Sequence, residues 1–168
     1  ERECSMLDYC DVEVLSENGY SESVLGRRKD SDCSDVIIRR ALNTDRVHAN
    51  NALVRREYDM LRLAGGLATP RVVAFESESG VCQFAAERVE GVALSSLCKH
   101  DSLGLRRKLD ISAAIAKCLA QLHDRGVVHG ALSPERIIVD GTDTAPTIKF
   151  FDLTSATFVD AEQDVSLS

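Results

Sequence analysis

Two stretches with helical periodicity divide this chain of 168 residues into blocks of different character. In residues 47–64 and 103–123, apolar side chains recur at the three- and four-residue spacing that favours amphipathic helices. Around the first of these helices the chain consists of short β-prone segments separated by turn-forming residues. This alternation predicts an α+β fold.

The first half predicts five strands with one helix embedded among them. The turn-like Glu17-Asn18-Gly19 separates the first two strands, and polar residues 27–34 predict a second turn. Gly65 and Gly66 are expected to end the helix, whose apolar face carries Leu53, Val54, Tyr58 and Leu61. A further turn is predicted at residues 77–80. The expected strands lie at residues 12–15, 24–25, 35–41, 71–75 and 81–87.

The second half predicts a long helix followed by a β-hairpin. Gly91 is a plausible hinge between the two halves, and Asp140-Gly141 should begin the hairpin loop between strands at 136–140 and 147–152. The apolar stripe expected along the helix consists of Leu105, Leu109, Ile111, Ile115, Cys118, Leu119 and Leu122.

Composition excludes several classes of function. The 20 Lys and Arg residues against 27 Asp and Glu give a net charge of −7, which argues against a nucleic-acid partner. The longest apolar run has four residues, far short of the ~20 of a membrane-spanning helix, so we expect no membrane insertion. The six cysteines are widely spaced, so we expect no zinc site but reduced, buried thiols in a cytoplasmic protein. The chain begins without Met and looks like a piece of a longer polypeptide.

Several short motifs, in a fixed order, resemble those of eukaryotic-type protein kinases. Residues 129–139, His-Gly-Ala-Leu-Ser-Pro-Glu-Arg-Ile-Ile-Val, resemble the catalytic loop H-R-D-L-K-P-E-N and the strand after it. Residues 148–154 resemble the strand that leads into the metal-binding D-F-G motif. Three earlier segments match in position: 36–39 the V-A-I-K strand, Glu57 the helix glutamate, and 87–91 the hinge.

This resemblance implies a two-lobed kinase fold that is cut short. Residues 1–90 would form an N-lobe with a five-stranded antiparallel sheet and one helix, and residues 91–168 part of a C-lobe. The family's later helices would be missing after the D-F-G position. The helix at 103–123 should therefore expose apolar surface, or be covered by a protein partner or the remainder of a larger chain.

The resemblance also implies that much of the transfer chemistry is lost. The catalytic aspartate falls at Ala131, whose methyl group accepts no proton, and general-base help is worth ~10²–10⁴ in rate. The loop lysine falls at Ser133, and the metal-binding asparagine at Arg136. Arg136 could supply a fixed positive charge in place of a metal, or simply pair with Glu135 or a nearby acid.

Other parts of a nucleotide site are retained on the same resemblance. The phosphate-gripping lysine falls at Arg39, which could pair with Glu57, and Asp152 keeps a carboxylate for Mg²⁺. Residues 15–24 keep one glycine of the Gly-rich loop and more simply predict a hairpin turn. Val24, Ala86 and the backbone at Glu87 and Val89 could hold an adenine, so ATP and Mg²⁺ are possible cofactors.

The sequence leaves four interpretations open. The leading one is a pseudokinase with a regulatory or docking role, similar to the kinase-like regions of large multi-domain sensor histidine kinases. The second is an active or residual Ser/Thr protein kinase. The third is a small-molecule phosphotransferase of the same superfold, whose H-G-D-L-x-P loop resembles residues 129–134. The last is an interaction module unrelated to kinases.

Overall fold

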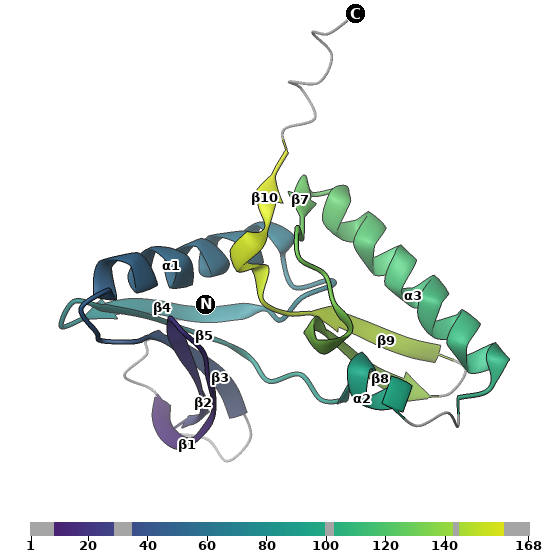
Figure 1. Ribbon diagram of the computed structural model, residues 1–168, viewed down its shortest axis with the longest axis horizontal. Helices are drawn as coiled ribbons and strands as arrows, with labels where there is room; N and C mark the ends of the chain where they lie inside the picture. Colours follow the sequence, from purple (N-terminus) through teal and green to yellow (C-terminus); the bar gives the residue numbers. More distant parts are fainter. Residues whose placement is uncertain (1–8, 29–34, 100–102, 143–144, 160–168) are drawn as a thin grey trace, which may run out of the picture. The chain divides into compact units, whose positions relative to one another are not determined.

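The computed structural model describes residues 9–28, 35–99, 103–142 and 145–159, and its contacts divide the chain into two compact units (Figure 1). The first unit comprises residues 1–62 and 71–88, and the second comprises residues 63–70 and 89–168. Each unit is described below by itself.

The first unit contains a five-stranded antiparallel sheet, which confirms the fold class expected from the sequence. The strand order is β1-β2-β3-β5-β4, so the central strand β3 pairs with β2 on one side and β5 on the other. The strands are β1 (Tyr9–Glu17), β2 (Ser21–Arg28), β3 (Asp35–Ala41), β4 (Val72–Glu78) and β5 (Val81–Glu87).

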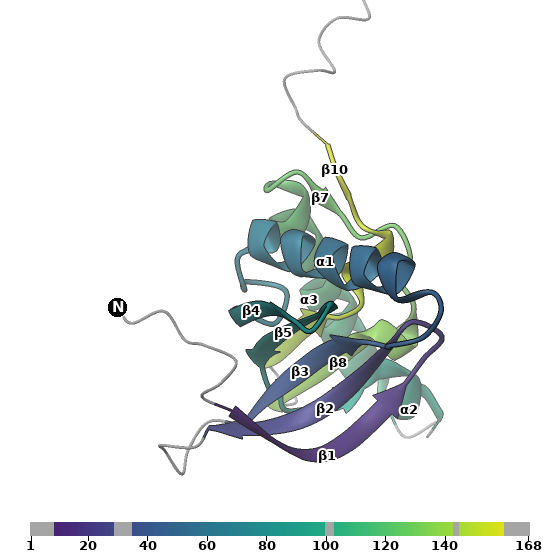
Figure 2. The same cartoon turned by 90° about the vertical axis from the view of Figure 1, so that its left-hand side faces the viewer.

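Helix α1 (Val47–Ala64) has the bounds predicted from its periodicity and lies along one face of this sheet (Figure 2). Its Tyr58 ring packs on the Phe75 ring of β4, with 4.6 Å between the ring centroids. The predicted apolar face is wrong at Leu53, which is 37% exposed, whereas Glu57, on the same face as Val54 and Leu61, is buried. Gly65 and Gly66 follow the helix with φ of 69° and 77°, conformations that glycine adopts without a Cβ penalty.

The hairpins of the first unit are tighter than predicted. β1 continues through Glu17, and the β1–β2 turn is closed by Asn18, whose Oδ1 accepts hydrogen bonds from the backbone N–H groups of Tyr20 and Ser21. The β4–β5 turn is confined to Ser79 and Gly80, because β4 extends to Glu78. β2 runs to Arg28, so the predicted turn at 27–34 is wrong at its start, and residues 29–34 lie outside the described part.

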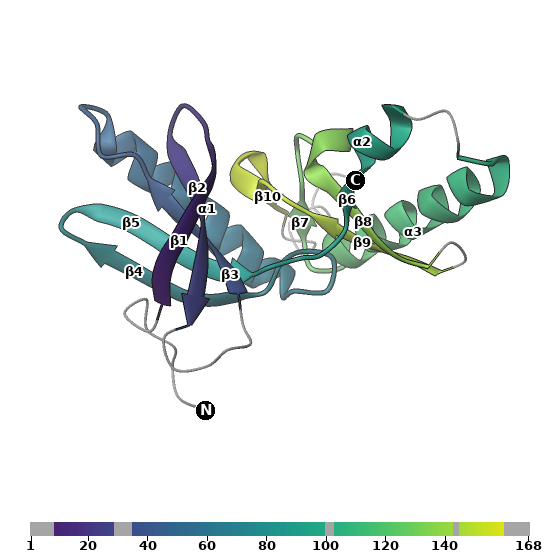
Figure 3. The same ribbon diagram turned by 90° about the horizontal axis from the view of Figure 1, so that it is seen from below.

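The described residues of the second unit form one short α-helix, one long α-helix, two 3₁₀ turns and two small sheets. Figure 3 shows α3 (Leu105–His123) beside the hairpin of β8 (Ile137–Thr142) and β9 (Ala145–Phe150). β6 (Val92–Ala93) adds a third strand to that hairpin, and β7 (Val127–Val128) pairs with β10 (Thr157–Phe158). The remaining elements are α2 (Leu94–Lys99) and the 3₁₀ turns η2 (Pro134–Arg136) and η3 (Leu153–Ser155).

Several boundaries in the second unit differ from the sequence prediction. Asp140 and Gly141 lie within β8, because that strand pairs with β9 up to Thr142, so the predicted loop start is wrong. Residues 143–144 lie outside the described part of the chain. β9 ends at Phe150, which leaves Asp152 in the segment that follows. Helix α2 and strands β6, β7 and β10 were not predicted, since elements of two to six residues carry too little periodicity.

The long helix α3 is only partly buried. Ile111 and Leu122 are 3% and 1% exposed, whereas Leu105 and Leu109 are 73% and 58% exposed. The predicted stripe is therefore wrong at its first two members, and the expectation of exposed apolar surface on this helix is confirmed. Among the described residues, no helix combines the length and apolar character needed to cross a membrane.

The cysteines are only partly as expected. Cys10 and Cys98 are exposed, so the prediction of uniformly buried thiols is wrong. Cys118, by contrast, is part-buried on α3, and burial raises the pKa of its thiol. Cys4 and Cys33 lie outside the described residues.

Candidate functional site

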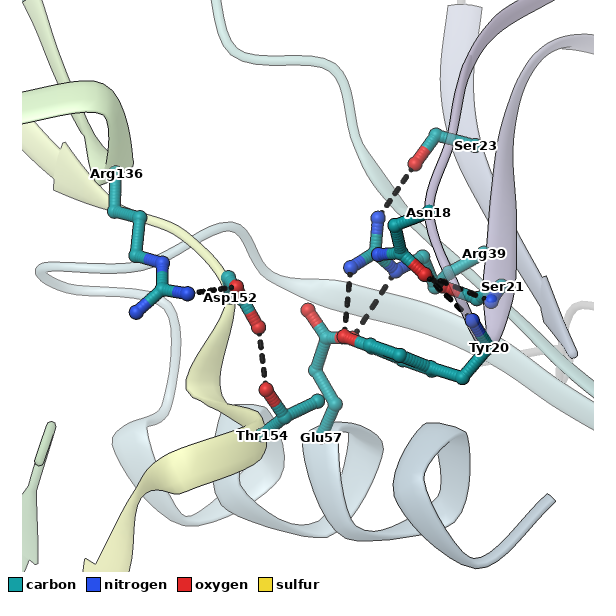
Figure 4. A network of polar contacts seen from close by, with 9 residues as sticks. All are labelled: Asn18, Tyr20, Ser21, Ser23, Arg39, Glu57, Arg136, Asp152 and Thr154. Carbon is teal, nitrogen blue, oxygen red and sulfur yellow. Dashed lines mark hydrogen bonds and ion pairs between the residues drawn. The ribbon is translucent and has the colours of Figure 1, made fainter. Parts of the chain in front are cut away.

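In the first unit, the side chain of Arg39 on β3 forms the predicted ion pair with Glu57 of α1 (Figure 4). The distance from Arg39 Nε to Glu57 Oε2 is 3.2 Å, and the two side chains are only 15% and 7% exposed. The neighbouring Arg40 pairs instead with Asp11 and Glu22. Partial burial lowers the pKa of Arg40, but hydrogen bonds and charge from those two acids raise it overall. The arginine that pairs with the helix glutamate is therefore Arg39.

Two further residues hold the guanidinium of Arg39. Its Nη1 donates to Ser23 Oγ at 2.7 Å, and its Nη2 donates to the hydroxyl of Tyr20 at 3.2 Å. Neither residue was predicted from the sequence. For Ser23 a signal existed, because strand pairing places it directly opposite Arg39. All three nitrogens of this guanidinium are thus engaged within the first unit.

The structure places the other predicted nucleotide-binding residues on β2, at the end of β5 and in the second unit. Val24 is 1% exposed and packs in the apolar core cluster of the sheet with Val36 and Ile38. Glu87 ends β5, and its backbone N–H donates to the carbonyl of Arg71 at 2.9 Å. Val89 belongs to the second unit.

In the second unit, the loop segment 129–136 is anchored by a buried histidine. His129 is 2% exposed, and its Nε2 lies 2.9 Å from the carbonyl oxygen of Phe151, as expected for a structural residue. Gly130 has a φ of 76°, and a Cβ there would collide with the carbonyl oxygen of Ser155. The loop therefore has no space for the arginine that kinases carry at this position.

The three degenerate positions of this loop offer no base. Ala131 presents a methyl group, and its carbonyl oxygen accepts a hydrogen bond from Arg136 Nη1. Ser133 is extended and precedes η2. The pKa of the exposed Glu135 is lowered by its own backbone N–H and then by the Ser133 hydroxyl. The Ser133 hydroxyl therefore hydrogen-bonds to the carboxylate of Glu135.

Asp152 follows β9 with a left-handed φ of 57° and is held from both sides (Figure 4). Its Oδ2 lies 2.9 Å from Arg136 Nη2, and its Oδ1 accepts a hydrogen bond from the Thr154 hydroxyl. Of the two partners weighed for Arg136, the nearby acid is therefore Asp152 and not Glu135.

These contacts test whether the residues suit the Mg²⁺ that kinases use. Mg²⁺ is held by one or two carboxylates with substrate phosphates, and its ligands are oxygens. Here the single carboxylate already neutralises a guanidinium, and no group of three or more His, Cys, Asp or Glu side chains is found among the residues that the structure describes. The residues at Asp152 do not fit Mg²⁺.

The fold and the order of these residues define a protein-kinase-like domain. Residues 35–162 match the lipopolysaccharide kinase (Kdo/WaaP) family, and the chain belongs to that family. The serine/threonine-protein kinase pkn2 of Myxococcus xanthus is 26% identical over 158 residues, which cover 92% of this chain but only 19% of that protein. The chain thus spans about a fifth of the length of this curated relative.

Proposed function

We propose that this domain is a pseudokinase, which keeps the kinase-like fold and acts by binding or regulation without transferring phosphate. The observation that carries the proposal is the state of the loop segment 129–136. The general base is replaced by Ala131, and the carboxylate of Asp152 is held by Arg136 and Thr154. Phosphoryl transfer depends on positioned phosphates, metal and charge stabilisation. This loop supplies no base, and the carboxylate of Asp152 is already engaged by Arg136 and Thr154.

The first unit supports the same proposal. In an active kinase the strand lysine contacts the nucleotide phosphates while pairing with the helix glutamate. Here Arg39 also donates to Ser23 and Tyr20, so a phosphate would compete with these two additional partners. We therefore expect at most weak ATP binding.

A regulatory or scaffolding role requires a partner. The matched relative is about five times as long as the region it shares with this chain, so we propose that the partner is a protein or another part of a larger chain. The exposed Leu105 and Leu109 of α3 are available for such a contact.

Residual transfer is the second candidate, because the matched family and the relative are both named as kinases. Positioning alone carries part of the rate, so slow transfer without the base is physically possible. If the acceptor is the one in the family's name, it would be a hydroxyl of lipopolysaccharide. If it is the one in the relative's name, it would be a Ser or Thr side chain.

The deciding experiment incubates the chain with γ-³²P-ATP and Mg²⁺, with lipopolysaccharide and a generic protein substrate as acceptors in separate reactions. We expect no transfer above a protein-free blank. A slow, Mg²⁺-dependent transfer that disappears in Asp152→Ala would overturn the pseudokinase proposal. Transfer that survives Asp152→Ala would indicate a contaminating kinase, and repurification must then remove it for the proposal to stand.

Nucleotide binding is measured separately by thermal shift with ATP and ADP. A ligand that binds only the folded state adds about 2.7 kcal/mol of stability at a concentration of 100 times its Kd. We expect a small shift or none at millimolar nucleotide. A large shift would show that the engagement of Arg39 does not prevent nucleotide binding.

A further inference from the structure

We infer that Arg136 is a built-in replacement for the divalent cation at Asp152, so that the second unit excludes Mg²⁺ and presents a guanidinium to anionic ligands instead. This inference deepens the proposed function, on which it rests for the absence of transfer chemistry. The misfit between Asp152 and Mg²⁺ is its starting point.

The guanidinium of Arg136 contacts the kinds of oxygen atom that a bound metal ion would contact. Arg136 Nη2 lies 2.9 Å from Asp152 Oδ2, the distance of a charge-assisted hydrogen bond. Its Nη1 donates to the backbone carbonyl of Ala131, which ties the side chain to the loop that carries it. One positive charge therefore bridges a carboxylate and a carbonyl oxygen, two kinds of oxygen that metal ions bind.

The carboxylate is also oriented for the guanidinium. Asp152 adopts a left-handed backbone conformation, and the Thr154 hydroxyl donates to its second oxygen. A metal ion would have to share these oxygens with the hydroxyl and the guanidinium, and it would lie beside the positive charge of Arg136. Because arginine stays protonated at any accessible pH, this repulsion cannot be relieved by loss of a proton.

The same geometry leaves part of Arg136 for a ligand. A guanidinium has five N–H donors in a planar fork, and the contacts at Ala131 and Asp152 use two of them. The side chain is 34% exposed, so it is partly open to solvent. Planar forks of this kind suit phosphate oxygens, and a phosphate-bearing ligand of this unit would bind without a divalent metal.

The experiment titrates Mn²⁺, a paramagnetic substitute for Mg²⁺, into the full chain and follows the loss of the free-ion resonance signal. We expect no saturable binding to the wild type. Arg136→Asn removes the charge and supplies an amide oxygen, and it should show the saturable Mn²⁺ binding that the wild type lacks. Arg136→Lys keeps the charge and should behave as the wild type.

A matched control comes from the same unit. Arg106 and Asp110 of α3 form an ion pair at 3.1 Å. Both residues lie on one helix, without the loop carbonyl that Arg136 contacts at Ala131, so Arg106→Asn should create no metal site. Saturable Mn²⁺ binding by the wild type would overturn the inference. Equal failure of the folded Arg136→Asn and wild-type chains would also overturn it, since the charge of Arg136 would then not be the excluding factor. If Arg136→Asn is unfolded by circular dichroism, the similarly shaped Arg136→Gln takes its place.

These outcomes are separable from the proposed function. Mn²⁺ binding without phosphate transfer would refute the role of Arg136 and leave the pseudokinase proposal standing. Phosphate transfer by a chain that binds no Mn²⁺ would refute the pseudokinase proposal and leave the role of Arg136 standing.

Discussion

Each unit of this protein contains an arginine–carboxylate pair that, on the kinase resemblance, falls where active kinases hold phosphate or metal. Arg39 and Glu57 lie 3.2 Å apart with side chains 15% and 7% exposed. Arg136 and Asp152 lie closer, at 2.9 Å, but their side chains are 34% and 23% exposed. On the kinase resemblance, the first pair preserves the family's charge arrangement, whereas the second introduces a cation where the family has an uncharged asparagine.

The two pairs differ in burial, so breaking them should cost different amounts of stability. A buried pair leaves an uncompensated charge when one partner is removed, so it is expensive to break even if it adds little net stability. A partly exposed pair is screened by water, and its loss costs less. We therefore expect the first pair to matter mainly for the stability of its unit and the second mainly for which ligands its unit accepts.

The largest expected effect is that of Glu57→Gln. Removing this carboxylate leaves the buried guanidinium of Arg39 without the negative charge of Glu57, beside the neutral partners Ser23 and Tyr20. We expect the free energy of unfolding to fall by about 3 kcal/mol, measured by urea denaturation. The control is Asp59→Asn on the same helix, which breaks the exposed pair with Arg55 and should cost less than about 0.5 kcal/mol. Equal losses in the two variants would contradict the difference in burial.

A smaller effect is expected for Asp152→Asn. Asparagine tolerates the left-handed φ of 57° at this position, so the change removes the charge without adding backbone strain. The partly exposed pair with Arg136 should then cost about 1 kcal/mol in the same urea experiment. The matched control Asp110→Asn removes a pair whose arginine is 90% exposed and should cost less. A loss as large as that of Glu57→Gln would show that the second pair is as structural as the first.

Sequence reasoning located the first pair better than the second. The bounds of α1 and β3 follow from periodicity, and the motif order places Arg39 and Glu57 on them. Apolar patterning alone would have buried Leu53, which is exposed, and so would not have found the buried Glu57. Glu57 is buried because it pairs with Arg39, and a hydrophobic pattern does not reveal such a pair.

The second pair depends on loop geometry that sequence does not specify. Arg136 lies at the end of the 3₁₀ turn η2, and Asp152 lies past the end of β9 in a left-handed conformation. The sequence placed both residues in strands, at 136–140 and 147–152, and so could not choose between Glu135 and another acid as the partner of Arg136. The Thr154 contact was missed for the same reason, since it arises from a turn of two residues.

The smallest expected effect is the response of the two pairs to salt, and it tests their difference most directly. The screening length falls from about 10 Å at 0.1 M to about 3 Å at 1 M ionic strength, and exposed charges are screened far more than buried ones. Between 0.1 and 1 M NaCl, the cost of Asp152→Asn relative to the wild type should therefore shrink by about half, a few tenths of a kcal/mol. The cost of Glu57→Gln should stay the same, because that pair is largely shielded from solvent. Taking each variant against the wild type at the same salt concentration removes the general effect of NaCl on unfolding. A parallel decline in both variants would mean that water and ions reach Arg39 as readily as Arg136, and the engagement of Arg39 would then be no obstacle to a phosphate ligand.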